Sequence, residues 1–171
     1  MNLRATTLVA LALVLFSTAA LAADTGPWPR VGGHFGMAVP LFSLSDPVTV
    51  IGRDFVSVGL TPGVTVKLDA HWSIDFELIA FNELKNSPAA TTLVVDPGVL
   101  YDFGPVVVGG RLATQVGAPT NFGLVPIIVV PFKISPSLSY FVEGDVPMFL
   151  RDRGNSLGAS IGLQFQTGIA F

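Results

Sequence analysis

The chain contains no cysteine and few charged residues. Without a thiol it forms neither a disulfide nor a thiolate metal site, and it has no cysteine nucleophile. Lys, Arg, Asp and Glu make up 12% of its 171 residues, against about 25% in a typical soluble domain. The formal net charge is −3, so the chain lacks the basic surface that binds nucleic acid, and we expect no nucleic-acid partner.

A long apolar run is missing after residue 22. The mean hydropathy is +0.65, yet charges, Pro or Gly interrupt every later run before it reaches the roughly 20 residues of a helical span. Residues 1–22 differ, because Arg4 precedes an apolar stretch at 8–16 and the small residues Ala20 and Ala22 follow it. This pattern predicts a cleaved secretory signal peptide at 1–22 and a mature domain at 23–171. A retained membrane anchor is the alternative.

The mature chain is rich in alternating apolar and small polar residues. Residues 157–171 show this most clearly, with Leu, Ile, Phe and Thr at odd positions and mainly Gly, Ser and Gln at even ones. A period of two is typical of a strand with two unlike faces. The pattern returns at 31–41, 56–68, 72–78, 92–101, 106–115, 122–133 and 140–148, which predicts eight strands.

Two features blur the pattern. Residues 127–130 are apolar on both faces, and we place Ile128 and Val130, with Phe122, Leu124 and Phe132, on the apolar face of that strand. Proline has no N–H for the ladder, so prolines inside predicted strands indicate bulges or shorter strands. They are Pro62, Pro97, Pro126, Pro131 and Pro147.

Connection lengths also alternate along the chain. Short turns are predicted at 69–71, 103–105 and 135–137, and longer loops at 43–54, 82–91, 117–120 and 151–156. Three short and four longer connections fit an up-and-down antiparallel barrel whose two ends lie on the side of the short turns. Outer-membrane barrels have short periplasmic turns and longer extracellular loops, so we expect these four loops to face outside.

The composition of the two faces indicates which one faces inward. The polar face is mostly Gly, Ser, Thr, Ala and Gln, which suits the crowded interior of an eight-stranded barrel better than a surface in water. The other face is Val, Leu, Ile and Phe, as a lipid-facing band requires. We therefore predict an all-β, eight-stranded antiparallel up-and-down transmembrane β-barrel. A secreted lipocalin-like ligand carrier, with the faces reversed, is the rival.

The chain resembles the small eight-stranded outer-membrane β-barrel proteins of the OmpA-like and OmpX-like kind. The resemblance rests on the signal peptide, the strand count and the terminal segment 162–171, GLQFQTGIAF. It implies the outer membrane of a Gram-negative bacterium, with outer-membrane lipids and lipopolysaccharide as partners. In such families the barrel-assembly machinery recognises a last strand that ends in Phe. Here that role falls on Leu163, Phe165, Ile169 and Phe171.

Charged residues on the polar face point into the predicted barrel, where lone charges are costly and pairing is expected. We predict a salt-bridge network centred on Arg111, whose planar guanidinium engages two carboxylates at once. Its members are Lys67, Asp75, Glu77, Asp96, Arg111, Glu143 and Asp145, with Lys133 a further candidate. A filled interior favours a structural or surface-interaction role. A narrow pore or a small-solute transport protein is the alternative.

The candidate catalytic and metal-binding residues are few. His71, Ser73 and Glu77 are residue types of an outer-membrane lipid hydrolase, but His71 falls in a predicted periplasmic turn, away from the outer leaflet. His34 is predicted to point inward with no second His or Cys near it, whereas a metal site needs several convergent ligands. We expect no enzyme activity, no metal and no cofactor. The sequence identifies neither a ligand nor an oligomeric state.

Overall fold

The structure, a computed structural model, describes residues 27–45, 48–85, 91–117, 121–152 and 157–171. The predicted signal peptide at 1–22 and parts of the four predicted loops lie outside these ranges. In the described ranges, no helix has the length and apolar character needed to cross a membrane.

Antiparallel strands make up nearly all of the described chain. Ten strands belong to one sheet. They are β1 (Arg30–Leu44), β2 (Thr49–Val50), β3 (Val56–Lys67), β4 (Trp72–Lys85), β5 (Thr91–Asp102), β6 (Val107–Gln115), β7 (Asn121–Ser135), β8 (Leu138–Asp145), β9 (Met148–Asp152) and β10 (Leu157–Ala170).

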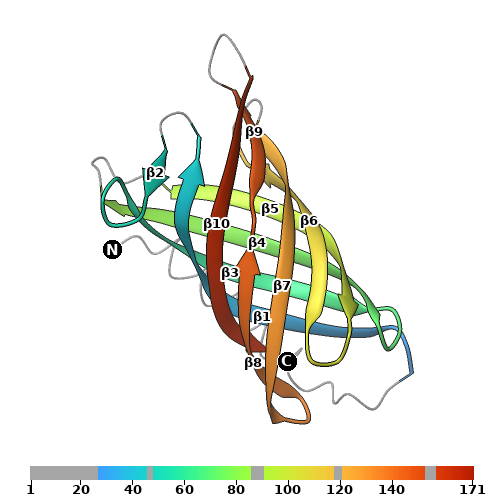
Figure 1. Ribbon diagram of the computed structural model, residues 1–171. Coiled ribbons are helices and arrows are strands. Elements are labelled where there is room, and N and C mark those ends of the chain that lie inside the picture. Colours follow the sequence, from blue (N-terminus) through green and yellow to red (C-terminus); the bar gives the residue numbers. More distant parts are fainter. Residues whose placement is uncertain (1–26, 46–47, 86–90, 118–120, 153–156) are drawn as a thin grey trace, which may run out of the picture.

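The sheet closes into a barrel because β1 pairs with β3 on one side and with β10 on the other (Figure 1). β8 and β9 follow each other between β7 and β10, and β2 pairs only with the end of β1. The wall therefore has eight strand positions, and the predicted all-β, eight-stranded antiparallel barrel is confirmed.

The last residue of the chain completes the closure. Phe171 N donates to Gly33 O at 2.9 Å, and Gly33 N donates to Phe171 O at 2.8 Å. The pairing of β1 with β10 runs on from there, with Ala170 opposite His34 and Gly162 opposite Ser43. The strong alternation of the terminal segment thus belongs to the strand that seals the barrel.

The predicted inward and outward faces are confirmed along the described strands, except at Lys67 and beyond the bulge in β1. Large apolar side chains such as Phe76, Leu112 and Ile128 are 51%, 66% and 50% exposed, while the residues beside them on each strand point inward. In β7 the predicted phase also holds, because Phe122 and Leu124 are exposed and Val125 and Ile127 are buried. The barrel is therefore apolar on its outside.

The in-strand prolines do not act as predicted. Strands β3, β5 and β7 continue through Pro62, Pro97, Pro126 and Pro131 without a register shift, since each proline costs the ladder only one donor. Only Pro147 coincides with an interruption, between β8 and β9. The bulges lie elsewhere, and the one between Pro40 and Phe42 in β1 shifts the alternation by one residue, so that Ser43, opposite Gly162, lines the barrel interior.

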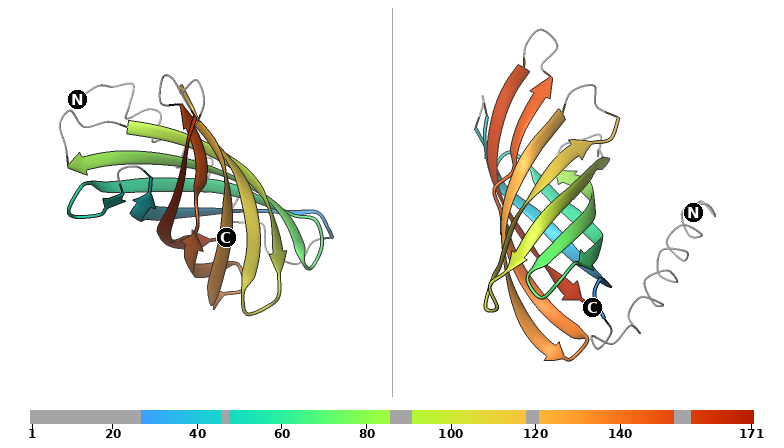
Figure 2. Two further views of the ribbon diagram at one scale, coloured as in Figure 1. Left: turned by 45° about the horizontal axis from the view of Figure 1, so that its top comes forward. Right: turned by 90° about the vertical axis from the view of Figure 1, so that its right-hand side faces the viewer.

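Strands extend further into two loops than the sequence predicted. β1 continues to Leu44 and β4 to Lys85, and β2 lies within the predicted loop 43–54. The predicted loops 43–54 and 82–91 are therefore partly strand. The short turns, in contrast, fall at 68–71, 103–106 and 136–137, as predicted, and share one end of the barrel with Phe171 (Figure 2).

Aromatic rings gather at this turn end. Tyr101 stacks on His71 and packs edge-on against Trp72, with ring centroids 5.4 Å and 4.8 Å apart. The Trp72 and His71 backbone N–H groups each donate to Asp69 Oδ1 at 2.8 Å, and these bonds lower the pKa of the Asp69 carboxyl. The turn between β3 and β4 is thereby fixed by its own aspartate.

Candidate functional site

Arg111 projects from β6 into the barrel and is 3% exposed. Its Nε and one terminal nitrogen lie 3.0 and 2.9 Å from Asp75 Oδ2. The other terminal nitrogen donates to Glu77 Oε1 at 3.2 Å and to Glu143 Oε1 at 2.7 Å. One guanidinium thus joins carboxylates of β4 and β8, and the predicted role of Arg111 as hub is matched by these contacts.

Further polar side chains complete these contacts. His34 Nε2 of β1 lies 2.7 Å from Glu77 Oε2, and Gln166 Nε2 of β10 donates to the same oxygen at 2.7 Å. Thr65 Oγ1 of β3 donates to Asp75 Oδ1 at 2.6 Å. The inward position of His34 was predicted from the sequence, but its contact with Glu77 and the role of Gln166 were not. The only signal for Gln166 was its place on the polar face.

We call this set the polar layer. Its members are His34, Asp75, Glu77, Arg111, Glu143 and Gln166, and their exposed fractions run from 0% to 6%. The layer is built from β1, β4, β6, β8 and β10, so it draws on most of the barrel wall. Almost no surface of these residues is accessible to water, so the layer is a filled part of the barrel interior.

Three of the predicted network residues lie outside the polar layer. Asp96 and Asp145 are buried next to it, at 1% and 0% exposure. Lys67 is exposed at the last residue of β3, so its predicted place in the network was wrong. Lys133 is exposed as well, near the end of β7. Both lysines lie near the turns, where a long side chain keeps its ammonium group in water.

The two outlying aspartates are incompletely paired. Asp145 Oδ2 accepts a hydrogen bond from Gln164 Nε2 at 2.7 Å. In the described part of the chain, Asp145 Oδ1 and Asp96 Oδ1 are buried without any hydrogen-bond partner. The Asp145 carboxyl also shares a hydrogen bond with the Glu143 carboxyl. An uncompensated buried carboxylate is costly, and the described side chains place no cation at Asp96 Oδ1 or Asp145 Oδ1.

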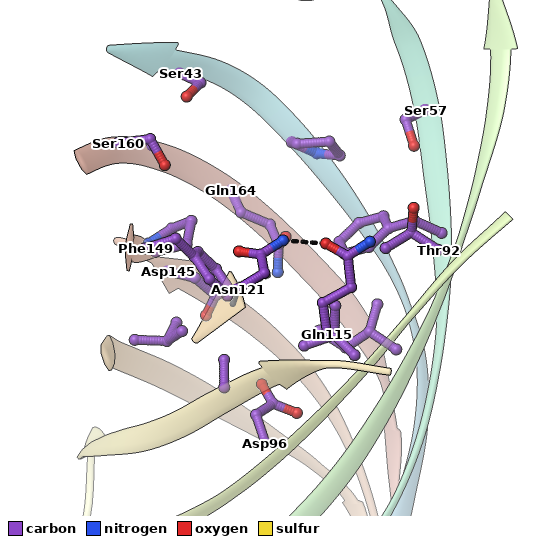
Figure 3. A pocket seen from close by; sticks show the side chains of 18 of the residues that line it. Ser43, Ser57, Thr92, Asp96, Gln115, Asn121, Asp145, Phe149, Ser160 and Gln164 are labelled. Atoms are coloured by element: carbon purple, nitrogen blue, oxygen red, sulfur yellow. Dashed lines mark hydrogen bonds between the residues drawn. The ribbon is translucent and has the colours of Figure 1, made fainter. Parts of the chain in front are cut away.

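A cavity of about 250 Å³ lies inside the barrel at its loop end (Figure 3). Arg111, Asp96, Asp145 and Gln164 belong to its lining where it meets the polar layer. Nearer the loops the lining includes Ser43, Ser57, Thr92, Gln115 and Asn121, and the Asn121 amide donates to Gln115 Oε1. Between them the walls are mainly apolar, formed by Phe42, Ile79, Phe81, Val94, Ala113, Val125 and Phe149.

The residues of the hydrolase alternative do not converge. His71 is exposed in a turn, where its Nδ1 lies 3.0 Å from Asp102 O. The contacts of Glu77 are instead His34, Arg111 and Gln166. Among the described residues, no group of three or more His, Cys, Asp or Glu side chains is placed to hold a metal ion.

Gly63 is required where β3 passes the His34 ring. A Cβ at Gly63 would overlap the imidazole, which is 6% exposed and bonded to Glu77. We expect Gly63→Ala to destabilise the folded barrel by about 1–3 kcal/mol, because His34 must leave its place in the polar layer. Urea unfolding in lipid vesicles measures this loss.

Gly110→Ala is the matched control for Gly63→Ala. The nearest atom to a Cβ at Gly110 is Leu124 Cδ1 at 3.8 Å, an ordinary contact. We expect the control to unfold at the urea concentration of the original chain. Equal effects of the two variants would show that His34 is not held against β3.

The residues assigned to barrel assembly lie along the seam strand β10. Phe165 and Ile169 are exposed on the outside at 40% and 43%, and Leu163 is half-buried. The Phe171 ring covers Gly33 on the neighbouring strand, because a Cβ there would lie 3.1 Å from it. An apolar ridge therefore follows the outside of the last strand.

No protein-family model, curated protein sequence or solved structure matches this chain.

Proposed function

We propose that the chain is an outer-membrane β-barrel protein with a structural or surface-interaction role in a Gram-negative bacterium. In this proposal the barrel wall lies in the lipid, the polar layer fills the interior, and the loops at 43–54, 82–91, 117–120 and 151–156 face outside. In this proposal the chain is related to the small barrels of the OmpA-like and OmpX-like kind. Residues 1–22 are the signal peptide that directs its export.

The outward apolar surface carries this proposal. Each of the eight strand positions in the barrel wall contributes large apolar side chains that are at least 37% exposed. Examples around the wall are Met37, Leu60, Phe76, Val99, Leu112, Ile128, Tyr140 and Phe165. Monomeric proteins in water rarely expose apolar patches beyond a few hundred Å². A surface that surrounds the whole barrel is suited to lipid tails.

The inverted interior supports the same conclusion. Asp75, Glu77, Arg111 and Glu143 are buried at 0–3% exposure, whereas a lipocalin-like carrier keeps its charged side chains outside and its apolar ones inside. Closure of β1 on β10 satisfies the backbone ladder without a free edge, as a strand-built span requires. Both observations favour the membrane barrel over the secreted carrier.

Burial of the polar layer favours a closed barrel over a narrow pore. A conducting path would have to pass between Arg111 and its three carboxylate partners, all at most 3% exposed. Breaking buried pairs of this kind is costly. We therefore infer that the barrel anchors its loops at the cell surface. Its partners in this proposal are outer-membrane lipids and lipopolysaccharide, and the barrel-assembly machinery recognises β10. We propose no enzymatic activity, since His71 lies apart from Glu77.

Gel mobility of the folded protein tests this proposal. We expect protein folded in detergent to run as a compact band on a cold gel and to shift after boiling, with a strong β signal in circular dichroism. In planar bilayers we expect no stable conductance steps. A monomer that stays soluble without detergent would favour the lipocalin-like carrier, and regular conductance steps would favour the pore.

A further inference from the structure

We propose that the cavity at the loop end binds a small organic cation, with an ammonium head toward Asp96 and Asp145 and an apolar body against the aromatic walls. This binding activity goes beyond the proposed structural role. It depends on the barrel interior alone, so it holds whether or not the outer surface lies in lipid.

The charge balance of the interior favours a cationic ligand. Five carboxyl groups are at most 3% exposed, namely those of Asp75, Glu77, Asp96, Glu143 and Asp145. Against them stand one buried guanidinium and one buried imidazole, while the exposed Arg151 guanidinium lies at the loop end of the cavity. Arg111 contacts three of the carboxylates, and His34 bonds one of the same three. The carboxyl groups of Asp96 and Asp145 form no ion pair with either.

Asp96 and Asp145 belong to the deep part of the cavity lining (Figure 3). Their Oδ1 atoms are both buried and unpartnered in the described part of the chain. A primary ammonium group has three donors and no acceptor, so it can donate to a carboxylate oxygen of this kind and offset one negative charge. A neutral or anionic head does not offer this match.

The walls select an organic cation over a metal ion. Phe81 and Phe149 line the cavity together with aliphatic side chains, and aromatic faces attract cations and pack against apolar bodies. Phe149 already receives one cation, because the Arg151 guanidinium carbon lies 5.6 Å from its ring centre. No metal-binding group of side chains accompanies the aspartates among the described residues.

The volume and position of the cavity limit the ligand further. A space of about 250 Å³ is smaller than the roughly 300–1,000 Å³ of drug-sized pockets. It suits a molecule of roughly ten heavy atoms. The polar layer closes the turn side, so the ligand enters from the loop end. Ser43, Ser57 and Thr92 give this end of the cavity a polar lining.

Amide chemical-shift titration of the isotope-labelled protein in non-ionic detergent tests the proposal. The probe is 2-phenylethylammonium, compared with the neutral 2-phenylethanol and the anionic 3-phenylpropionate. We expect shifts at cavity residues such as Ser160 and Gln164, with affinity at least about tenfold higher for the ammonium probe. Equal responses to the three probes, or shifts confined to outward-facing residues, would overturn the proposal.

Aspartate variants assign the binding to the cavity. We expect Asp96→Asn and Asp145→Asn each to weaken binding of 2-phenylethylammonium at least about tenfold. Folding should persist, because asparagine has nearly the same shape and each change removes an incompletely paired charge. Asp102→Asn is the matched control at the opposite end, where Asp102 accepts only the Gly104 N–H at 2.6 Å. Unchanged affinity in both cavity variants, or an equal loss in the control, would refute the site.

Discussion

Arg111→Met is expected to destabilise the barrel by about 3–5 kcal/mol, the usual cost of removing one partner from a buried ion network. Methionine fills similar space but leaves Asp75, Glu77 and Glu143 without their shared cation. These carboxyl groups are 0–3% exposed, so water does not take over the lost contacts. His34 bonds only Glu77 closely, at 2.7 Å, and does not replace the guanidinium.

Urea titration of barrel refolded into lipid vesicles measures the effect of Arg111→Met. Arg53→Met is the control, because Arg53 pairs with Asp54 at 2.8 Å but is 67% exposed, and exposed pairs contribute little. We expect the control to unfold with the original chain. If Arg111→Met also does so, the polar layer is not what stabilises the interior. Arg111→Lys should fall between them, since lysine lacks the bidentate fork.

Leu112→Arg is the second substitution that we expect to destabilise the folded barrel strongly. Leu112 follows Arg111 on β6 and points outward, with 66% of its surface exposed. A charged side chain at the middle of a lipid-facing band costs about 2–4 kcal/mol. In water the same change at an exposed site would stay within roughly 0.5 kcal/mol. The size of the loss therefore separates a lipid-facing wall from a wet one.

Val116→Arg is the matched control for Leu112→Arg. Val116 is 53% exposed and lies just beyond the last residue of β6, toward the loop end. Near the membrane interface the cost of arginine falls to about 0–1 kcal/mol. We expect vesicle-refolded Leu112→Arg to unfold at clearly lower urea than Val116→Arg. Equal midpoints would contradict a lipid band centred on Leu112.

The barrel could be predicted from the sequence because apolar and small polar residues alternate along each strand, which gives every strand one inward and one apolar outward face. It located the strands and their phases, including β7, where Val125 and Ile127 face inward although they are apolar. The short turns were equally legible, since Asp69 and Gly104 mark reversals by their residue type. These signals are local, and each depends on neighbours in the chain.

The interior contacts were only partly readable. Arg111 was predicted as the hub because its planar guanidinium engages two carboxylates at once. Its detailed partners depend on register between strands, and His34 and Glu77 are 43 residues apart. The predicted place of Lys67 in the network was wrong because its position near a turn lets its ammonium group reach water. The cavity also escaped prediction, since the bulge after Pro40 that turns Ser43 inward leaves no mark in the alternation.

Lipid contact along the outside of β10 would distinguish a membrane barrel from a water-soluble one. The chain has no cysteine, so single cysteines can carry a spin label at positions 161–169 in protein refolded into lipid vesicles. For a lipid-facing wall we expect the accessibility of the spin label to oxygen, which dissolves in lipid, to peak at Ile161, Phe165 and Ile169. It should be low at Gln164 and Gln166. Peaks at these outward positions for a water-soluble relaxation agent instead of oxygen would contradict a lipid-facing wall.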